Sequence, residues 1–206
     1  MTDIFENGTK LPLIDEFYTL QGEGFHTGKA AYFIRIGGCD IGCSWCDTKI
    51  SWKADLNKLI DVDDVIQRAV LSESGAIVVT GGEPSSYDLD YLCRQAKKHN
   101  IKTFIETSGN NELTGEWDWI CLSPKPQSPP VQSSYDNANE LKIIIQNPED
   151  FIWAEKCAEK VNQNCILYLQ PEWSKHKTMT KTIVNYIKTN IKWKISVQLH
   201  KYIKIP

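Results

Sequence analysis

From about residue 31 onward, short apolar runs alternate with segments whose apolar residues have helical spacing. Ala76-Ile77-Val78-Val79-Thr80 is typical of a buried strand, whereas the preceding segment 61–73 is typical of an amphipathic helix. Strands that alternate with helices predict a parallel sheet with right-handed crossovers. The predicted strands are residues 31–36, 76–80, 102–106, 119–122, 141–145, 166–169 and 194–197. The predicted helices are residues 61–73, 89–99, a segment beginning near Pro148, and 179–189.

The length of 206 residues limits the architecture that this alternation can build. A complete eight-fold β/α barrel usually takes about 250 residues. An incomplete barrel and an open doubly wound sheet are therefore the two candidates, and we expect a single domain over residues 1–206. One long loop, residues 123–139, contains four prolines.

Polar tracts that contain glycine, proline or other loop-forming residues follow five of the predicted strands. These tracts are residues 80–84, 106–109, 123–125, 170–172 and 198–201. Active sites of parallel α/β proteins gather at the carboxyl ends of the strands. A sixth loop, which carries three cysteines, follows strand 31–36. We therefore expect six loops to converge on one face.

The sixth loop contains Cys39, Cys43 and Cys46 in a C-x3-C-x2-C spacing. Three thiolates this close in sequence can hold one inorganic centre and leave its fourth position open. A zinc site is an alternative, and His26 is available as a fourth ligand, but no second ligand pair appears at zinc-site spacing. Inert core cysteines are a further alternative, yet the surrounding polar residues and glycines are typical of a loop. The spacing favours an iron–sulfur cluster.

Composition excludes several classes of protein and partner. The net charge of -3 does not indicate nucleic-acid binding. No apolar run approaches the roughly 20 residues of a membrane helix, and the first residues do not resemble a signal peptide. Seven cysteines without a disulfide-framework spacing fit a reduced, cytoplasmic protein.

The cysteine loop, with Trp45 before the third cysteine, and the Gly-Gly-Glu-Pro tract after the second strand resemble the radical SAM superfamily. A narrower resemblance, to 7-carboxy-7-deazaguanine synthases, runs from about residue 13 to the last residues. It rests on the Leu-Gln-Gly-Glu-Gly segment at 20–24, Arg35, the Cys-Asp-Thr segment at 46–48, and the segments 106–109, 123–125, 140–142 and 198–201. The resemblance implies an incomplete TIM-like β/α barrel with mostly parallel strands.

The same resemblance implies an activity. A lyase of this family converts 6-carboxy-5,6,7,8-tetrahydropterin to 7-carboxy-7-deazaguanine, with loss of ammonia, on the route to queuosine and related 7-deazapurines. Its cofactors are a [4Fe-4S] cluster, S-adenosylmethionine and Mg²⁺. Its partners are the pterin substrate, a flavodoxin-like or similar reductant, and a second copy of the chain in a homodimer.

The resemblance also implies roles for individual residues. The cluster ligands are Cys39, Cys43 and Cys46, and the Mg²⁺ ligand is Thr48. The expected substrate contacts are Leu20, Gln21, Gly22, Arg35, Thr80, His200 and the terminal carboxylate of Pro206. The expected S-adenosylmethionine contacts are Trp45, Cys46, Asp47, Gly82, Glu83, Ser123, Pro124, Lys125, Gln170, Pro171, Glu172 and Trp173. Near Trp173 the sequence departs from the family pattern, which leads us to expect a smaller residue or Asp there.

Chemistry supports some of these roles, and each has a structural alternative. Arg35 is one of three arginines, and its planar fork suits a carboxylate, but an ion pair at a strand end is the alternative. Thr48 can also be a turn cap, His200 a structural histidine, Gln21 part of a plain turn, and Pro206 a frayed end.

Two other functions remain open from the sequence. An activase that installs a glycyl radical on a partner protein shares parts of these motifs. Many such enzymes carry additional ferredoxin-like cysteines, whereas Cys93, Cys121, Cys157 and Cys165 are dispersed here. A zinc-binding module is the alternative from a different class.

Overall fold

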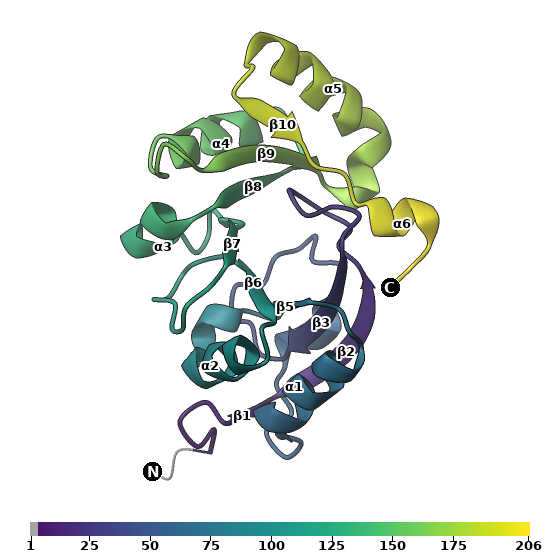
Figure 1. Ribbon diagram of the computed structural model, residues 1–206. Helices are drawn as coiled ribbons and strands as arrows, with labels where there is room; N and C mark the ends of the chain where they lie inside the picture. Colours follow the sequence, from purple (N-terminus) through teal and green to yellow (C-terminus); the bar gives the residue numbers. More distant parts are fainter. Residues whose placement is uncertain (1–3) are drawn as a thin grey trace.

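The strands of the main sheet follow the alternation in the sequence, and all but one run parallel to one another (Figure 1). The computed structural model describes residues 4–206, in which eight strands pair in the order β10-β9-β8-β7-β6-β5-β3-β2. They are β2 (Leu13–Leu20), β3 (Ala30–Ile36), β5 (Ala76–Gly81), β6 (Lys102–Thr107), β7 (Trp119–Leu122), β8 (Glu140–Ile145), β9 (Ile166–Pro171) and β10 (Trp193–Ile195). β2 is the antiparallel strand. A separate small sheet pairs β1 (Lys10–Leu11) with β4 (Ile60–Asp61).

The longer helices pack against the outer face of the curved sheet (Figure 1). They are α1 (Val62–Leu71), α2 (Asp90–Lys98), α3 (Gln132–Asn137), α4 (Asp150–Ala158) and α5 (His176–Thr189). The five-residue helix α6 (Leu199–Ile203) has no buried residue and follows the last strand near the C-terminus. The short 3-10 helices are η1 (Lys49–Trp52), η2 (Pro84–Ser86) and η3 (Trp173–Lys175). In α1 the buried residues have i, i+3, i+4, i+7 spacing, so one stripe faces the sheet. Among residues 4–206, no helix has the length and apolar character that crossing a membrane requires.

Side chains along each strand alternate between the outer core and the interior of the curved sheet. In β3, Ile34 and Ile36 belong to the core formed with α1 and α2. Phe33 and Arg35 point the other way and line an interior cavity. Arg35 lies near the end of an otherwise apolar strand. Because side chains alternate between the two faces of that strand, Arg35 points into the interior.

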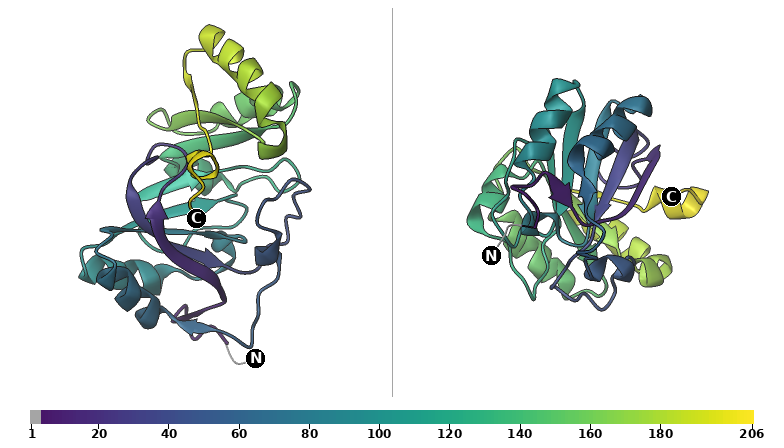
Figure 2. Two further views of the ribbon diagram at one scale, coloured as in Figure 1. Left: turned by 90° about the vertical axis from the view of Figure 1, so that its right-hand side faces the viewer. Right: turned by 90° about the horizontal axis from the view of Figure 1, so that it is seen from below.

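The sheet is open between its two end strands, β2 and β10. Over residues 4–206, no strand pairing joins them. The loop after β2 and the C-terminal segment meet there instead, because Leu199 N–H donates to the Gly22 carbonyl at 2.8 Å and Gly24 N–H donates to Ser196 Oγ at 3.0 Å. Figure 2 (left) shows the C-terminal segment crossing this open side. The predicted incomplete, mostly parallel α/β barrel is confirmed.

Three parts of the fold differ from the sequence predictions. β2 was not predicted, because Leu13–Leu20 mixes polar and apolar residues without strict alternation. The segment 123–139 was predicted as a loop, but it contains α3, which is ordered by the burial of Ser134 and Tyr135. The last strand begins one residue earlier than predicted and ends at Ile195, since the chain then turns into α6.

Candidate active site

The loops at the carboxyl ends of the parallel strands converge on one cavity of about 280 Å³ inside the barrel, as predicted. Most of the residues assigned to a site from the sequence line it: Leu20, Gly22, Arg35, Cys39, Cys43, Trp45, Cys46, Asp47, Thr48, Thr80, Gly82, Glu83, Ser123, Lys125, Gln170, Pro171, Glu172, Trp173, His200 and Pro206. Gln21 and Pro124 do not line it. Both are buried, and the Gln21 amide donates to Glu106 at 2.8 Å. The structure therefore brings the candidate residues together with two exceptions.

The cysteine loop leaves β3 and is held at its start by backbone hydrogen bonds to η1. Cys39 N–H donates to the Trp52 carbonyl at 3.0 Å. Cys43 is buried, and its sulfur accepts a hydrogen bond from Gln127 Nε2 at 3.3 Å. Burial raises the pKa of the Cys39 and Cys43 thiols, which is the opposite of what a free nucleophilic thiol needs. The cysteine loop thus does not have the character of a site for a free nucleophilic thiol.

The spacing of these thiols bears on which centre they suit. Ligands of zinc at about 2.3 Å lie within about 4 Å of one another. Within the described part of the chain, no three His, Cys, Asp or Glu side chains form a group that could hold a metal ion. An iron–sulfur cluster is larger than a single ion, so its thiolates are further apart. The three cysteines line one cavity, as the thiolate ligands of a single cluster would.

The loop after β5 lies so close to the cysteine loop that only glycine fits at residue 82. A Cβ atom at Gly82 would meet the Gly38 carbonyl oxygen at 2.1 Å and that of Ser51 at 2.8 Å. The Gly82 N–H is bonded to the Ile36 carbonyl at 2.7 Å, and the Glu83 N–H to that of Gly38 at 2.8 Å. These two N–H groups are therefore already engaged. An amino group of a bound ligand donates hydrogen bonds, so its partners in this loop would be carbonyl oxygens.

Glu83 joins two of the loops through its carboxylate. It accepts hydrogen bonds from Ser85 N–H at 3.0 Å, Ser108 N–H at 2.8 Å and the Thr107 hydroxyl. Glu83 is 2% exposed. Glu83 therefore fixes the loop after β5 to the loop after β6, and its carboxylate has little capacity left for a ligand.

The opposite wall comes from β7, β9 and the segments that follow them. Lys125 donates to Ser123 Oγ at 2.8 Å and lies 5.5 Å from the Trp45 ring centre, and burial lowers its pKa. The Trp173 ring stacks on His176 at 4.3 Å and meets the Tyr202 ring edge-on at 5.4 Å. This wall thus combines aromatic faces with a buried ammonium, which suits a flat ring bearing polar groups.

Arg35, Thr48 and Asp47 form a hydrogen-bonded chain along the cavity. Arg35 Nη1 donates to Thr48 Oγ1 at 3.2 Å, and Thr48 Oγ1 donates to Asp47 Oδ1 at 3.2 Å. The Arg35 guanidinium also lies 5.8 Å from the centre of the Phe17 ring. No acidic side chain neutralises Arg35 among the ion pairs of residues 4–206. Its fork is therefore suited to an incoming carboxylate.

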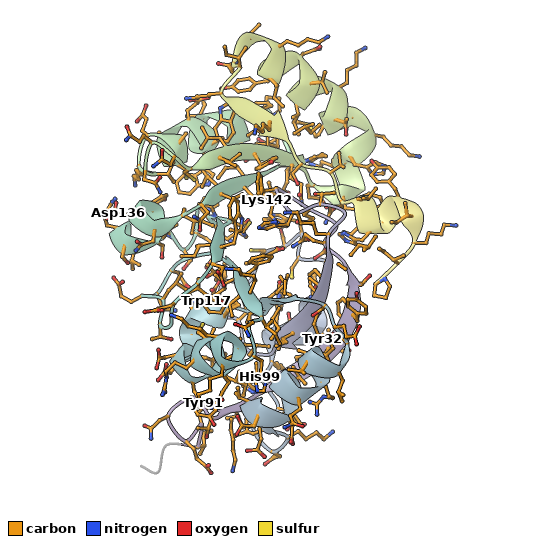
Figure 3. All side chains as sticks on the ribbon, viewed as in Figure 1. Tyr32, Tyr91, His99, Trp117, Asp136 and Lys142 are labelled. Atoms are coloured by element: carbon orange, nitrogen blue, oxygen red, sulfur yellow. The ribbon has the colours of Figure 1, made fainter. Side chains whose placement is uncertain are left out.

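A buried ion network, which we call the floor, was not assigned a role from the sequence. It consists of Lys142 on β8 (Figure 3), Glu106 on β6 and Glu23 in the loop after β2. Lys142 Nζ lies 3.0 Å from Glu106 Oε2 and also contacts Glu23, whose other oxygen accepts from Gln198 Nε2 at 2.8 Å. The signal in the sequence is a lysine inside an apolar strand, Glu140–Ile145.

Lys142 and Glu23 favour each other's charged form in the floor. Burial alone would lower the pKa of Lys142, but the Glu106 and Glu23 carboxylates raise it well above its ordinary value. Burial opposes ionisation of Glu23, yet Lys142 lowers the pKa of this carboxyl. Two carboxylates against one ammonium leave a net negative charge, so the floor suits a ligand edge that donates hydrogen bonds. His200 packs against Gly22 beside the floor, and burial lowers its pKa.

The tip of the loop between β2 and β3 packs against the inner face of the sheet next to the floor. The His26 ring stacks on Phe104 at 4.3 Å, and the Phe25 ring stacks on Trp119 at 4.5 Å. Glu140 Oε2 accepts hydrogen bonds from Phe25 N–H at 3.0 Å and Trp119 Nε1 at 3.2 Å. These contacts hold the loop that follows β2 and supplies Gly22 and Glu23 to the cavity.

Comparison with known proteins places this geometry in a family. Residues 33–117 match the Radical SAM superfamily. A 7-carboxy-7-deazaguanine synthase from Flavobacterium psychrophilum is 54% identical over 98% of this chain and 95% of its own length. One from Synechocystis sp. is 44% identical over 94% and 93%.

A solved structure agrees with these relatives. The crystal structure of QueE from Escherichia coli superposes with a TM-score of 0.82 at 27% identity and covers 97% of this chain and 99% of that one. The superfamily implies a [4Fe-4S] cluster and S-adenosylmethionine as cofactors, and the cavity provides three thiols and a close-packed glycine loop for them. Given such identity over nearly the whole of both sequences, the chain belongs to the 7-carboxy-7-deazaguanine synthase family of radical SAM enzymes.

Proposed function

We propose that this chain is a single-domain radical SAM lyase that converts 6-carboxy-5,6,7,8-tetrahydropterin to 7-carboxy-7-deazaguanine and releases ammonia. One observation carries the proposal: a single cavity contains the cysteine loop, an arginine with no acidic partner among residues 4–206, and a buried floor with excess negative charge. The arginine matches a substrate carboxylate, and the floor matches a ring edge on the other side that donates hydrogen bonds. The relatives support it by their names.

Cys39, Cys43 and Cys46 would hold the cluster, and the loop after β5 would hold S-adenosylmethionine. When bound, the two cofactors supply hydrogen-atom abstraction from the substrate. The chain's own part is to position and shield the reactants. The walls that would contact S-adenosylmethionine carry Trp45, Asp47, Gly82, Ser123, Lys125, Gln170, Pro171, Glu172 and Trp173. We assign Glu83 to fixing these loops, because its carboxylate is engaged by three donors.

The substrate would lie between Arg35 and the floor. The Arg35 fork binds the substrate carboxylate with two parallel hydrogen bonds. Glu23 and Glu106 accept hydrogen bonds from the amino and ring N–H groups of the pterin. The remaining contacts would come from Leu20, Gly22, Thr80, His200 and Pro206, which line the same cavity. Gln21 would act from outside the cavity by holding Glu106.

Thr48 would be the protein ligand of Mg²⁺. Its hydroxyl lies in the cavity beside Arg35, so a substrate carboxylate on Arg35 would bring further oxygens close to it. Mg²⁺ prefers oxygen ligands and usually keeps several waters. We also propose a cytoplasmic homodimer that takes its electron from a flavodoxin-like or similar reductant and binds neither nucleic acid nor membrane.

The test is anaerobic reconstitution with iron and sulfide, followed by addition of dithionite, S-adenosylmethionine, Mg²⁺ and 6-carboxy-5,6,7,8-tetrahydropterin. Mass spectrometry should detect 7-carboxy-7-deazaguanine and ammonia in equal amounts. Cleavage of S-adenosylmethionine without this product would refute the proposed reaction and favour a glycyl-radical activase. A colourless protein that binds zinc and no iron would refute both enzymes.

A further inference from the structure

A lysine near the end of the chain, Lys201, contacts the carboxylate of Asp47, which directly follows the cysteine loop and lines the cavity. Lys201 Nζ lies 2.6 Å from Asp47 Oδ2. The other oxygen of Asp47 accepts the Thr48 hydroxyl at 3.2 Å, and the Thr48 oxygen accepts from Arg35 at 3.2 Å. The contacts thus run without a break from α6 to the proposed Mg²⁺ ligand and the proposed carboxylate clamp.

We propose that Lys201 is a positioning residue that fixes the Asp47 carboxylate, and through it the Thr48 hydroxyl, so that the Thr48 oxygen faces the cavity as a ready cation ligand. The proposal rests on the function proposed above, since it concerns the Thr48 site of that reaction. It adds a residue from α6 to a site otherwise built from the cysteine loop.

The hydrogen-bonding capacity of the groups gives the chain of contacts a direction. A hydroxyl has one proton to donate and two lone pairs to accept with, and a carboxylate can only accept. The Thr48 proton must therefore point to Asp47, which leaves the lone pairs of Thr48 for Arg35 and for a cation. If Asp47 turned away, the hydroxyl could rotate, and its proton could point into the cavity.

Asp47 needs such a fixing group because its side chain is 54% exposed. Lys201 can supply the fixing because it is itself held: its side chain is 18% exposed, and its ammonium lies 5.1 Å from the centre of the Trp173 ring. Gln198 Nε2 is a second donor to Asp47 Oδ2, at 3.3 Å. With two donors on Oδ2, the carboxylate keeps Oδ1 for Thr48.

The expected consequence is a loss of cation affinity. Groups that orient a metal ligand typically contribute 10–100-fold to metal affinity. Lys201→Met keeps the apolar stem over Trp173 and removes only the ammonium, whereas Lys201→Arg keeps a positive charge near Asp47. Lys204→Met is the matched control, because Lys204 is an exposed lysine three residues along that does not line the cavity.

The experiment uses Mn²⁺ as a probe for the Mg²⁺ site. Mn²⁺ is titrated into the cluster-loaded enzyme with the pterin substrate present and S-adenosylmethionine absent, so that no turnover occurs, and free Mn²⁺ is measured by electron paramagnetic resonance. We expect Lys201→Met to raise the Mn²⁺ dissociation constant about tenfold. Lys201→Arg should recover much of the affinity, and Lys204→Met should match the wild type.

A second measurement separates this role from simple anchoring of α6. Asp47→Asn and the double variant with Lys201→Met complete a double-mutant cycle. If Lys201 acts through Asp47, the two effects on Mn²⁺ affinity will be far less than additive. Additive effects, or a Mn²⁺ affinity of Lys201→Met equal to that of the wild type, would overturn the proposal.

The wild-type enzyme distinguishes failure of this proposal from failure of the proposed function. Wild-type protein that makes 7-carboxy-7-deazaguanine but binds no Mn²⁺ leaves the reaction standing and refutes the positioning role. Wild-type protein that makes no such product refutes the reaction itself. Substrate binding of Lys201→Met is also measured without any divalent cation. If the substrate dissociation constant rises there while the Mn²⁺ affinity is unchanged, Lys201 holds the α6 segment in place and does not orient Thr48.

Discussion

The cysteine loop and the floor belong to the same cavity but are built in opposite ways. The cysteine loop is local: its three thiols lie within eight residues, and neighbouring backbone groups hold it in place. The floor joins residues that are 119 and 36 positions apart in the chain, with a lysine that is 3% exposed. Because of this difference, we expect that turnover can be abolished without loss of the fold at the cysteine loop, but not at the floor.

The strongest test of this contrast is Cys43→Ala. The variant loses one of three cluster ligands, so we expect turnover to fall to background while the fold is retained. The side chain removed is small and lies in a loop, so the cost in unfolding free energy should be about 1 kcal/mol. Product formation, iron–sulfur absorption and urea unfolding of the apo protein measure the three expectations.

The matched control is Cys165→Ala, which removes a half-buried thiol outside the cavity. It should keep the cluster absorption and the activity. Full activity of Cys43→Ala would show that this thiol is not a ligand, and collapse of its fold would show that the loop and the fold are coupled after all.

At the floor, we expect Lys142→Met to reduce the stability of the fold strongly and to leave cluster binding intact. The substitution leaves the Glu23 and Glu106 carboxylates buried without their ammonium. Removal of one partner from a buried ion pair typically costs about 3–5 kcal/mol. We therefore expect a large drop in the free energy of unfolding, measured in urea, together with loss of substrate binding, while the cysteines remain able to take up iron.

Neutral residues in place of Glu23 and Glu106 should restore the stability of the Lys142→Met variant but not its substrate binding. Adding Glu23→Gln and Glu106→Gln to Lys142→Met removes the buried charges, so much of the lost stability should return. The triple variant should still fail to bind the pterin, because carboxylate acceptors are missing. An unfolding free energy of Lys142→Met equal to that of the wild type would contradict the role of the floor in the fold.

The same contrast explains what could be predicted from the sequence. The strand–helix alternation predicted most of the parallel strands, and the cysteine spacing predicted the part of the site that neighbouring residues build. Lys142 and Glu23 could be quoted as motif residues but not paired, since only the fold brings β8 beside the loop after β2. The side chain of Gln21 was placed in the cavity, whereas the fold turns it to Glu106. The antiparallel β2 was missed because its side chains face partly exposed surroundings on both sides and carry no clear period.

The smallest expected effect concerns Glu140, which lies next to the floor and holds the same loop. Its side chain is 3% exposed, and burial raises the pKa of this carboxyl above its ordinary value of 4.5. The folded state thus binds the proton more tightly than the unfolded state does. Protonation of Glu140 therefore stabilises the fold below about pH 4.5, and this contribution is lost as the pH rises through the folded-state pKa.

Glu140→Gln should remove that dependence without disturbing the contacts. The two N–H donors both go to Oε2, so the amide oxygen can accept them. The Cys121 thiol now donates to Oε1, and in the variant the amide nitrogen can donate to the Cys121 sulfur instead. The unfolding free energy of the variant should equal that of the wild type near pH 4 and exceed it at pH 8. Urea unfolding across this range measures the difference, with Glu159→Gln, at an exposed position, as the control for one lost charge. A variant less stable than the wild type at pH 8 would mean that Glu140 is held as a carboxylate, and the floor would then extend to a third acidic group.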